Sequence, residues 1–459
     1  MLLKEYGAEG GCDMNILMKI WKAVKGLFDK VKADSAAGKF EVKPAISSDM
    51  LSRIQLWQDM WCGKAYWLDK GKGVESLNIE QDITKEFACT ATNEMTVTIS
   101  DKALQAAFDH AVRDLAEELQ EGLASGAMII KPLGEDKVQY VSQFDFVPTE
   151  YNSEKRLTGV IFPDQRKLGD KYYTRLEYHH ISSSGLTIVN KAYVSGSENE
   201  LGKETVLSAV EEWAELPPEI TYPGVTRPIY GYYRNPIKNK LGSSAGVSIY
   251  DSAVMKIRRA DIQAGRLDWE FESGERRIHV DSQAIKLTEN GESVLDDRLY
   301  KGLDLMQHGE DLYKEYSPTL RQRDFIEGLE EQKREIEFSL GLAYGDLSNV
   351  NSVEKTATEM KISRQRKYNM VTAIQDDLRD CLEDLCYGLA FFGGKVNSGY
   401  EMTCTFHDSI TTDEETERKQ DMQDVSLGVM SLVEYRMKWY GEDEKTAASK
   451  IPESAQVME

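Results

Sequence analysis

The sequence predicts an α+β protein, and three patterns in the chain lead to this class. Over much of residues 46–126 and again after residue 317, apolar residues recur every third or fourth position, as on one face of an α-helix. Between residues 128 and 194 the period changes to two, which is typical of β-strands. From residue 356 the helical period continues for about 35 residues, which corresponds to a rod of roughly 50 Å.

The composition is that of a folded, acidic protein. The chain has 459 residues, of which 41% are hydrophobic and 29% charged, and its length corresponds to roughly two to four domains. A net charge of −22 argues against a sequence-reading nucleic-acid binder, which carries a basic face. No apolar run approaches the ~18 residues that cross a bilayer, and no signal-peptide pattern is found. The cysteines lack metal or disulfide spacing, which fits a reducing cytoplasm; they are Cys12, Cys62, Cys89, Cys381, Cys386 and Cys404.

Residues 1–40 are predicted to form an N-terminal arm. Met14 opens a short basic amphipathic helix that runs to about Val31. Such a helix lies on a membrane surface in some proteins, but it more often docks on its own chain.

The body, residues 41–240, is predicted to begin with helices and continue with strands. Ser47 or Ser48 precedes a first helix, short strands are expected after it, and Ser100 caps a second helix that ends at Gly126. The expected strands, separated by turns, are 128–131, 138–141, 159–163, 172–181 and 186–194. A proline-rich stretch over 217–236 then marks a change of architecture.

Residues 241–272 are predicted to be a hinge and a helix. The glycines of Leu241–Tyr250 invite a phosphate-loop interpretation, but no Gly-Lys-Ser/Thr follows and no strand clearly precedes them. A hinge with Ser248 as the helix cap is the better account. The helix is expected to end near Phe271.

The second half predicts a small insertion between two helices, followed by a loop and a very long helix. Residues 273–316 carry ten acidic against six basic residues and a turn at 289–291. Ser317-Pro318 is expected to start a helix that ends near residue 342. A Gly/Asp/Ser/Asn loop over 343–355 precedes a capping box, Thr356–Glu359, and the long helix 356–394. Residues 395–459 are expected to form one strand, 401–407, and a helical end opened by a second capping box, 412–415.

No pattern in the chain predicts a catalytic, cofactor or metal site. There is no Walker A sequence, HExxH or CxxC. His179 and His180 are neighbours on a predicted strand and therefore face opposite sides. Cys381 and Cys386 fit helix packing better than metal ligation, and His110 is expected to be solvated. Asp408 beside His407 has no companion nucleophile in its motif.

A series of short segments along nearly the whole chain is distinctive: Trp57, Trp61–Trp67, Gly126–Pro132, Phe146–Thr149, Arg175–His179, Ile188–Tyr193, Gly246–Tyr250, Lys355–Glu359 and Phe406–Ser409. In these segments the chain resembles the portal proteins of tailed bacteriophages, in the long-tailed branch. Each is weak alone, but their order and spacing cover roughly residues 45–450.

The resemblance implies a ring-forming portal fold with an α+β wing, a helical stem, a small α/β clip, a long helix and an α-helical C-terminal crown. The implied segments are the arm 1–40, wing 41–240, stem helix 241–272, clip 273–316, stem helix 317–342, tunnel loop 343–355, long wing helix 356–394, and wing strand and crown 395–459. The ring of such proteins is dodecameric in assembled particles and sits at the single capsid vertex through which DNA is packaged and ejected.

The resemblance also implies site residues, partners and location. The tunnel loop contributes Asp346, Ser348, Asn349, Asn351 and Ser352 to the DNA channel. Partner docking falls on clip residues Asp296, Asp297, Asp304, Glu310 and Asp311, and contacts between subunits fall on stem residues Arg258, Arg259, Arg266, Glu330, Lys333 and Glu337. The implied partners are further copies of the chain, the terminase large subunit, a head-tail adaptor, the major capsid and scaffolding proteins, and double-stranded DNA that passes without sequence-specific binding. The implied location is the virion, after assembly in the host cytoplasm, without membrane contact.

Other function classes stay open at this point. A packaging motor or nuclease subunit would need a Walker lysine or clustered acidic metal ligands, and neither is visible. A non-phage cytoplasmic scaffold, or a membrane-surface protein acting through the basic N-terminal helix, is the second alternative. The portal of a gene-transfer particle or of a defective prophage is the third.

Overall fold

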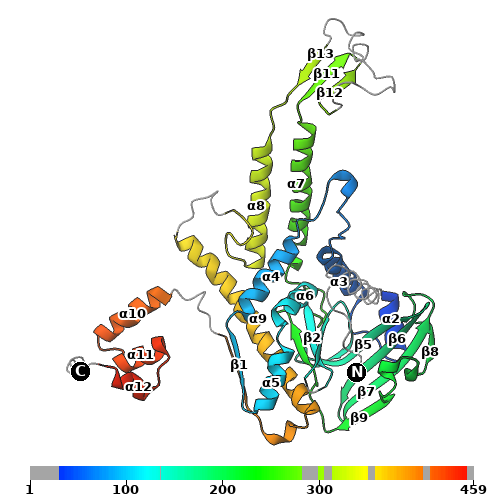
Figure 1. Cartoon of the computed structure of the whole chain (residues 1–459), viewed down its shortest axis with the longest axis vertical. Coiled ribbons are helices and arrows are strands. Elements are labelled where there is room, and N and C mark those ends of the chain that lie inside the picture. The colour runs from blue at the N-terminus through cyan, green and yellow to red at the C-terminus, as the bar shows by residue number, and fades with distance from the viewer. Residues whose placement is uncertain are drawn as a thin grey trace, which may run out of the picture. The chain divides into compact units, whose positions relative to one another are not determined.

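The computed structural model describes residues 30–134, 136–281, 298–303, 313–349, 357–406 and 414–451. It confirms the α+β class (Figure 1). The chain divides into two compact units: Met1–Asn93 with Thr98–Thr403, and Glu94–Val97 with Cys404–Glu459. Within the described ranges, no helix is both long and apolar enough to cross a membrane.

The largest sheet of the first unit has six strands and is antiparallel throughout. Its order is β4-β5-β6-β7-β8, and β9 also pairs with β7. The strands are β4 Val147–Tyr151, β5 Leu157–Leu168, β6 Lys171–Ser182, β7 Gly185–Ser195, β8 Lys203–Thr205 and β9 Glu219–Pro223. The period-two pattern therefore predicted the three long strands correctly but ended β5 too early.

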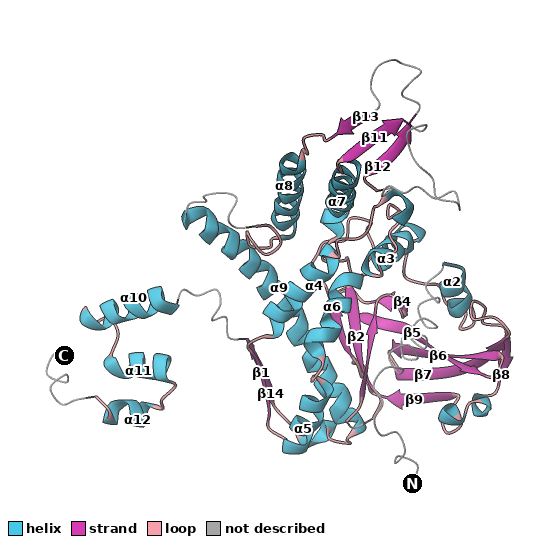
Figure 2. Ribbon diagram, turned by 45° about the horizontal axis from the view of Figure 1, so that its top comes forward, coloured by secondary structure: helices cyan, strands magenta, loops and turns pink. Residues whose placement is uncertain are grey.

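Helix α2, Lys30–Gly38, lies against this sheet (Figure 2). Its small residues Ala33, Ala36 and Ala37 are buried among sheet residues that include Leu176 and Tyr193. The last part of the predicted arm thus belongs to the core, because alanines allow close approach of the helix to the sheet. Most of the predicted basic helix, 14–31, lies outside the described residues.

A second sheet, with the order β10-β2-β3, packs against the long helix α9, Ala357–Phe392. Its strands are β2 Ala127–Pro132, β3 Val138–Ser142 and β10 Gly231–Arg234. The face of α9 predicted to be apolar is buried, and its members are Val371, Ile374, Leu378, Cys381, Leu385 and Leu389. Its period and its length were therefore predicted correctly from sequence.

Between α2 and β2 the chain forms the helices α3 Ser48–Trp61, α4 Ile79–Thr92, α5 Lys102–Ala111 and α6 Leu115–Ser125. Ser47 caps α3, with its hydroxyl accepting the Met50 amide at 3.2 Å, as predicted. The predicted single helix from Ser100 to Gly126 is instead α5 and α6. The Asp101 carboxylate caps α5 because it accepts two amides, whereas the Ser100 hydroxyl accepts the Glu401 amide. The short strands predicted between the two helices are wrong for most of this segment, which forms helix α4 and only one strand, Met95–Ile99.

Gly126 ends α6 with φ +103° and lies against Gly246. A Cβ atom on Gly246 would stand 2.0 Å from the Gly126 carbonyl oxygen. The glycine at position 246 therefore serves close packing of two backbone segments, which accounts for the glycine-rich stretch without a phosphate.

Helices α7, Val254–Ser273, and α8, Gln322–Leu340, lie side by side and lead to and from a three-stranded sheet (Figure 1). This sheet has the order β12-β11-β13, with β11 Arg277–Asp281, β12 Tyr300–Leu303 and β13 Tyr313–Tyr316. Strand β12 is parallel to β11 and β13 is antiparallel to it. The predicted insertion between two helices is confirmed.

Both predicted caps of this helix pair are wrong. The hydroxyl of Ser248 accepts the Tyr250 amide, and α7 begins six residues later, after the short 3₁₀ helix Asp251–Ala253. Helix α8 begins at Gln322, beyond Ser317-Pro318. Its first turn is held by Glu270 of α7, whose carboxylate accepts the Arg321 amide at 3.0 Å.

Strands β1, Met95–Ile99, and β14, Met402–Phe406, pair with each other. The second unit also contains α10 Glu414–Ser426, α11 Leu432–Tyr440 and α12 Glu444–Ser449. Ser431 and Glu434 form a capping box that starts α11. Short 3₁₀ helices elsewhere in the chain are Lys70–Lys72, Leu207–Ala209, Glu211–Trp213 and Val396–Ser398. Several predicted features lie outside the described residues: the turn 289–291, Thr356, His407, Asp408 and Thr412.

Candidate functional site: the helix pair and the loop after it

The loop that follows α8 is folded against its own helix over its described residues, 343–349. Gly341 ends α8 with φ +76°, and the chain turns back at this point. The Asp346 carboxylate accepts the Ala343 amide at 2.8 Å and closes the turn. Asn351 and Ser352, two of the predicted channel residues, lie outside the described residues.

The carboxylate of Glu337 holds the loop from inside. One of its oxygens accepts the amides of Gly345, Leu347 and Ser348 at 3.2, 2.8 and 2.7 Å. The other accepts the Ser348 hydroxyl at 3.0 Å. Glu337 and Ser348 are exposed by only 2% and 5%. The Glu337 carboxylate and the Ser348 hydroxyl thus bind each other within the chain, whereas the resemblance implied a subunit contact for Glu337 and a channel contact for Ser348.

Glu330 lies about two helical turns before Glu337 on α8 and holds the end of the described loop. Its carboxylate accepts the Asn349 amide at 2.6 Å and pairs with Lys333 at 3.1 Å. Burial alone would raise the pKa of Glu330, but these two contacts hold the pKa below its ordinary value. Glu330 and Lys333, which were predicted to contact a neighbour, thus make these contacts within the chain. Asn349 itself is exposed.

The loop is also tied to α9 and α4. Lys367 of α9 pairs with Asp346 at 3.1 Å and with Glu86 of α4. The Ser363 hydroxyl of α9 accepts the Tyr344 amide at 2.8 Å. Burial raises the pKa of Asp346, and the charge of Lys367 opposes that shift. These contacts join the base of the loop to α4 and α9 as well as to α8.

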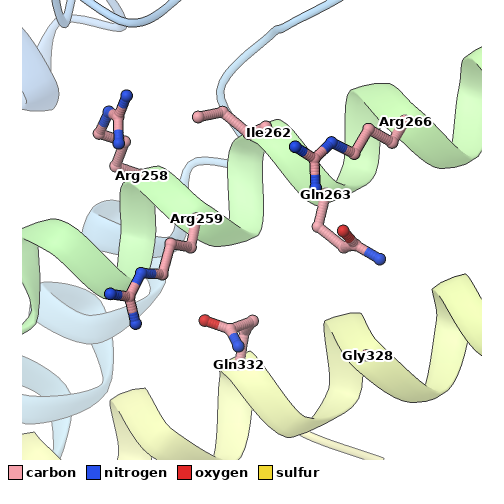
Figure 3. Close-up of a pocket in the computed structure, with 7 residues that line it drawn as sticks. All are labelled: Arg258, Arg259, Ile262, Gln263, Arg266, Gly328 and Gln332. Atoms are coloured by element: carbon pink, nitrogen blue, oxygen red, sulfur yellow. The ribbon is translucent and has the colours of Figure 1, made fainter.

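The three predicted stem arginines, Arg258, Arg259 and Arg266, lie on α7 beside a hollow of about 440 Å³ (Figure 3). Gln263 and Gln332 face the gap between the helices, while Arg258 and Ile262 lie on another side of α7. None of these arginines makes a hydrogen bond or ion pair with any residue that the structure describes. In a chain with a net charge of −22, three such arginines on one helix form a distinct basic surface.

The predicted docking residues of the small sheet all lie outside the described residues: Asp296, Asp297, Asp304, Glu310 and Asp311. Ion pairs lie on and beside the described strands: Arg276 pairs with Glu315 of β13 at 2.8 Å, and Arg298 pairs with Glu275. A hollow of about 310 Å³ beside them is lined by Trp269, Arg277, His279 and Tyr316, among others. Sequence reasoning missed this aromatic and basic surface, because its members come from a helix and two strands far apart in the chain.

A hollow of about 740 Å³ in the body has a buried charge cluster on one side. Glu177 contacts Lys131 at 2.7 Å, His179 at 2.6 Å and Arg175 at 3.1 Å. Burial would raise the pKa of Glu177, but the charge of Lys131, the hydrogen bond with His179 and the charge of Arg175 hold this pKa well below its ordinary value. Burial lowers the pKa of His179. The cluster joins β2 to β6 through ion pairs, and within it the Arg175 Nε and His179 Nδ1 atoms are buried without a hydrogen-bond partner among the described residues.

The structure also places the histidines and cysteines for which the sequence predicted no catalytic or metal-binding role. His179 is enclosed, whereas the side chain of neighbouring His180 is 38% exposed and pairs with Glu150, so the two rings face opposite sides as predicted. Cys381 and Cys386 are buried in the packing of α9. The His110 ring lies 2.8 Å from the Asp136 carbonyl oxygen. Among the described residues, no group of three or more histidine, cysteine or acidic side chains is placed to hold a metal ion.

In comparisons with known proteins, no protein-family model and no curated protein matches the chain. Function is therefore inferred from the residues and their geometry.

Proposed function

We propose that the chain is a portal protein of a tailed phage, which forms a dodecameric ring at the unique capsid vertex. In this role the ring is the channel for DNA packaging and ejection and the docking site for terminase and head-tail adaptors. The observation that carries the proposal is the order α7, small sheet, α8, loop, α9 within one unit. This order follows the stem, clip, stem, tunnel loop and long helix that the sequence resemblance implies.

The construction of this segment suits a ring with a channel. An inserted sheet carried by two adjacent helices forms a platform away from the body (Figure 1). A loop whose base is held by Glu337, Glu330 and Lys367 stays at a defined height on the helix pair. Twelve copies around an axis would present twelve such loops to a central duplex.

The charge of the chain supports passage of DNA without retention. A net charge of −22 repels a polyanion, and exposed Asn349 offers a neutral side chain to phosphates. In this proposal the chain has no catalytic residue and no cofactor, and partner enzymes supply the ATP hydrolysis. Partner docking falls on the small sheet that α7 and α8 carry.

The direct test is the assembly state of the purified chain. A dodecamer of 52.0 kDa subunits has a mass of roughly 620 kDa. Mass photometry and negative-stain images should show closed rings with a central hole. A separate ATPase assay of the pure protein should show no activity. Monomers alone at micromolar concentration, with and without magnesium, would contradict the proposal.

A deletion of the N-terminal segment distinguishes the portal proposal from the alternative of a membrane-surface scaffold. The structure shows where this deletion should end. Ala33, Ala36 and Ala37 are part of the core, so the deletion should remove residues 1–29 only. A portal chain keeps its rings after this deletion. A scaffold that acts through the basic segment instead loses vesicle binding, and vesicle flotation measures that loss.

A further inference from the structure

The hollow of about 440 Å³ between α7 and α8 lies in the middle of the helix pair, between two polar contacts that join the helices (Figure 3). At one end Lys256 of α7 donates to α8, and at the other end Glu270 accepts the Arg321 side chain. Between these contacts, Gln263 reaches a carbonyl oxygen of α8 at 3.5 Å, which is long for a hydrogen bond. The middle of the pair is therefore held by polar contacts less firmly than its ends.

The side of α7 that borders this hollow is cationic. Arg259, Gln263 and Arg266 follow each other at steps of four and three, so they lie on one side of the helix. Arg259 and Arg266 are exposed, and neither makes a hydrogen bond or ion pair with a described residue. Seven positions separate them, which corresponds to roughly 10 Å along the axis. None of the residues that line the hollow, all of them described, is acidic.

The side of α8 that borders the hollow leaves room and supplies a further amide. Gly328 lies inside α8, where glycine is less stable than alanine. A Cβ atom at this position would stand 3.3 Å from Gln263 Nε2, so a longer side chain would project into the hollow. The Gln332 Oε1 atom is buried without a hydrogen-bond partner among the described residues, and a half turn of the amide would present its N–H donors there instead. Gly328 thus keeps open a space that polar groups surround.

We propose that this hollow binds a free oligophosphate, a short chain of phosphate groups, between the guanidinium groups of Arg259 and Arg266. The planar fork of N–H donors on each arginine matches phosphate oxygens, and the amides of Gln263 and Gln332 donate between them. A single carboxylate is too short to reach two guanidinium groups roughly 10 Å apart, whereas a chain of phosphates offers oxygens along that length. The inference goes beyond the proposed function and does not depend on ring formation.

A free oligophosphate fits the hollow better than duplex DNA does. The lining residues come from both helices, so the ligand enters between them. Packed helices have axes about 8–10 Å apart, and a duplex is too wide for such a gap. Arginines that held the DNA backbone would also slow the passage that the proposed function requires.

The test is isothermal titration of the full-length chain with sodium tripolyphosphate, in buffer without divalent cations. We expect one saturable site per chain, with an affinity that falls as salt is added. Arg259→Gln and Arg266→Gln should each weaken binding at least tenfold, because each loses hydrogen bonds to a charged group. The matched control is Arg113→Gln, which removes the same charge at an exposed position outside the hollow and should leave the affinity within about twofold.

Substitutions at Gly328 test the space itself. Gly328→Glu places a carboxylate in the hollow and should abolish binding, although glutamate is a better helix former than glycine. Gly328→Ala adds a single methyl group and should weaken binding less. Thermal unfolding of each variant without ligand shows whether it is folded. Tripolyphosphate should raise the melting temperature of the wild type and leave that of Gly328→Glu unchanged.

The other outcomes would overturn the proposal. If the wild type binds no tripolyphosphate at millimolar concentration, or if the arginine and Gly328→Glu variants bind it equally well, the hollow is not its site. If only duplex DNA binds, and Arg259→Gln weakens that binding, the arginines contact DNA instead. If tripolyphosphate does not bind and the arginine variants lose their rings, the arginines join copies of the chain. Mass photometry of the same samples reports ring formation separately, so failure of this site leaves the proposed function standing.

Discussion

Glu337 accepts two hydrogen bonds from Ser348, one from the main-chain amide at 2.7 Å and one from the hydroxyl at 3.0 Å. The two residues lie eleven positions apart, on either side of the turn that Gly341 begins. Because the same carboxylate also holds Gly345 and Leu347, one side chain of α8 determines where the loop starts. The position of the loop therefore depends directly on that of the helix pair.

The first prediction concerns this contact. Glu337→Gln keeps the shape but replaces one acceptor oxygen by an amino group, which then faces a donor. Hydrogen bonds to charged groups contribute about 1.5–3 kcal/mol, so we expect a loss of stability of that order at the loop. Hydrogen exchange should show faster exchange of the amides of Gly345, Leu347 and Ser348, with ring assembly unchanged. Exposed Glu331→Gln on the same helix is the control and should leave the exchange rates as they are.

The second prediction concerns the charge that the loop presents to DNA. Asn349 is exposed, so Asn349→Lys adds a cation without disturbing the anchors, and Asn351→Lys adds a second cation two positions further along the chain. Each added phosphate contact strengthens non-specific binding and steepens its salt dependence. Purified rings should bind duplex DNA more tightly at low salt, and packaging should slow. Asn349→Asp should act in the opposite direction, and equal binding by all three variants would show that the loop does not meet DNA.

Ser348→Lys is expected to behave differently from these two. Its side chain is enclosed and donates to Glu337, so lysine cannot be accommodated without opening the loop. A loss of loop protection, rather than tighter DNA binding, should be the main effect.

The third prediction follows from Glu80, a nearly enclosed carboxyl with one oxygen that has no hydrogen-bond partner. Burial, with a smaller contribution from Asp261, raises the pKa of Glu80 from 4.5 to about 7. The folded chain therefore keeps a proton that the unfolded chain releases above pH 4.5, and stability falls as the pH rises from 4.5 to 7. Above pH 7 the cost reaches roughly 3 kcal/mol.

Glu80→Gln removes this cost. The melting temperature should rise at pH 8 and change much less at pH 5, as measured by thermal scans of both proteins. Exposed Glu75→Gln serves as the control. A gain of equal size at both pH values would mean that ionisation of Glu80 is not its cause.

The fourth prediction concerns the close approach of Gly246 to Gly126. Alanine at position 246 would bring its Cβ within 2.0 Å of a carbonyl oxygen, and the backbone cannot yield without moving α6. Overpacking of this kind costs typically 1–3 kcal/mol or more. Gly246→Ala should therefore lower the melting temperature by several degrees. Gly196→Ala, which meets nothing within 4 Å, should leave it within about a degree.

Local patterns in the chain predicted the elements whose stability comes from one continuous face. The buried face of α9 repeats at helical spacing, and β5, β6 and β7 alternate at period two, so each was recognisable without knowledge of its partner. The Ser47 cap was predicted for the same reason, because the donor and the acceptor are three residues apart.

Helix starts that depend on residues distant in the sequence could not be predicted. The sequence favoured Ser317-Pro318 as the start of α8, but the helix begins where Glu270, 51 residues earlier, binds the Arg321 amide. Likewise, the Ser100 hydroxyl binds the amide of Glu401, which left Asp101 to cap α5. A side chain that is used elsewhere in the fold cannot cap its own helix, and only the tertiary structure shows where it is used.

The sequence by itself determined the α+β class, the small insertion between two helices, the length of α9, and a loop before it. Periodicity and turn residues suffice for these, since they act within a few positions of the chain. Only the tertiary structure decided that Glu337, Glu330 and Lys367 hold this loop, and that Arg258, Arg259 and Arg266 are left without partners among the described residues. Whether a charge is paired depends on which distant segments fold against it, and the period of a helix or strand carries no information about that.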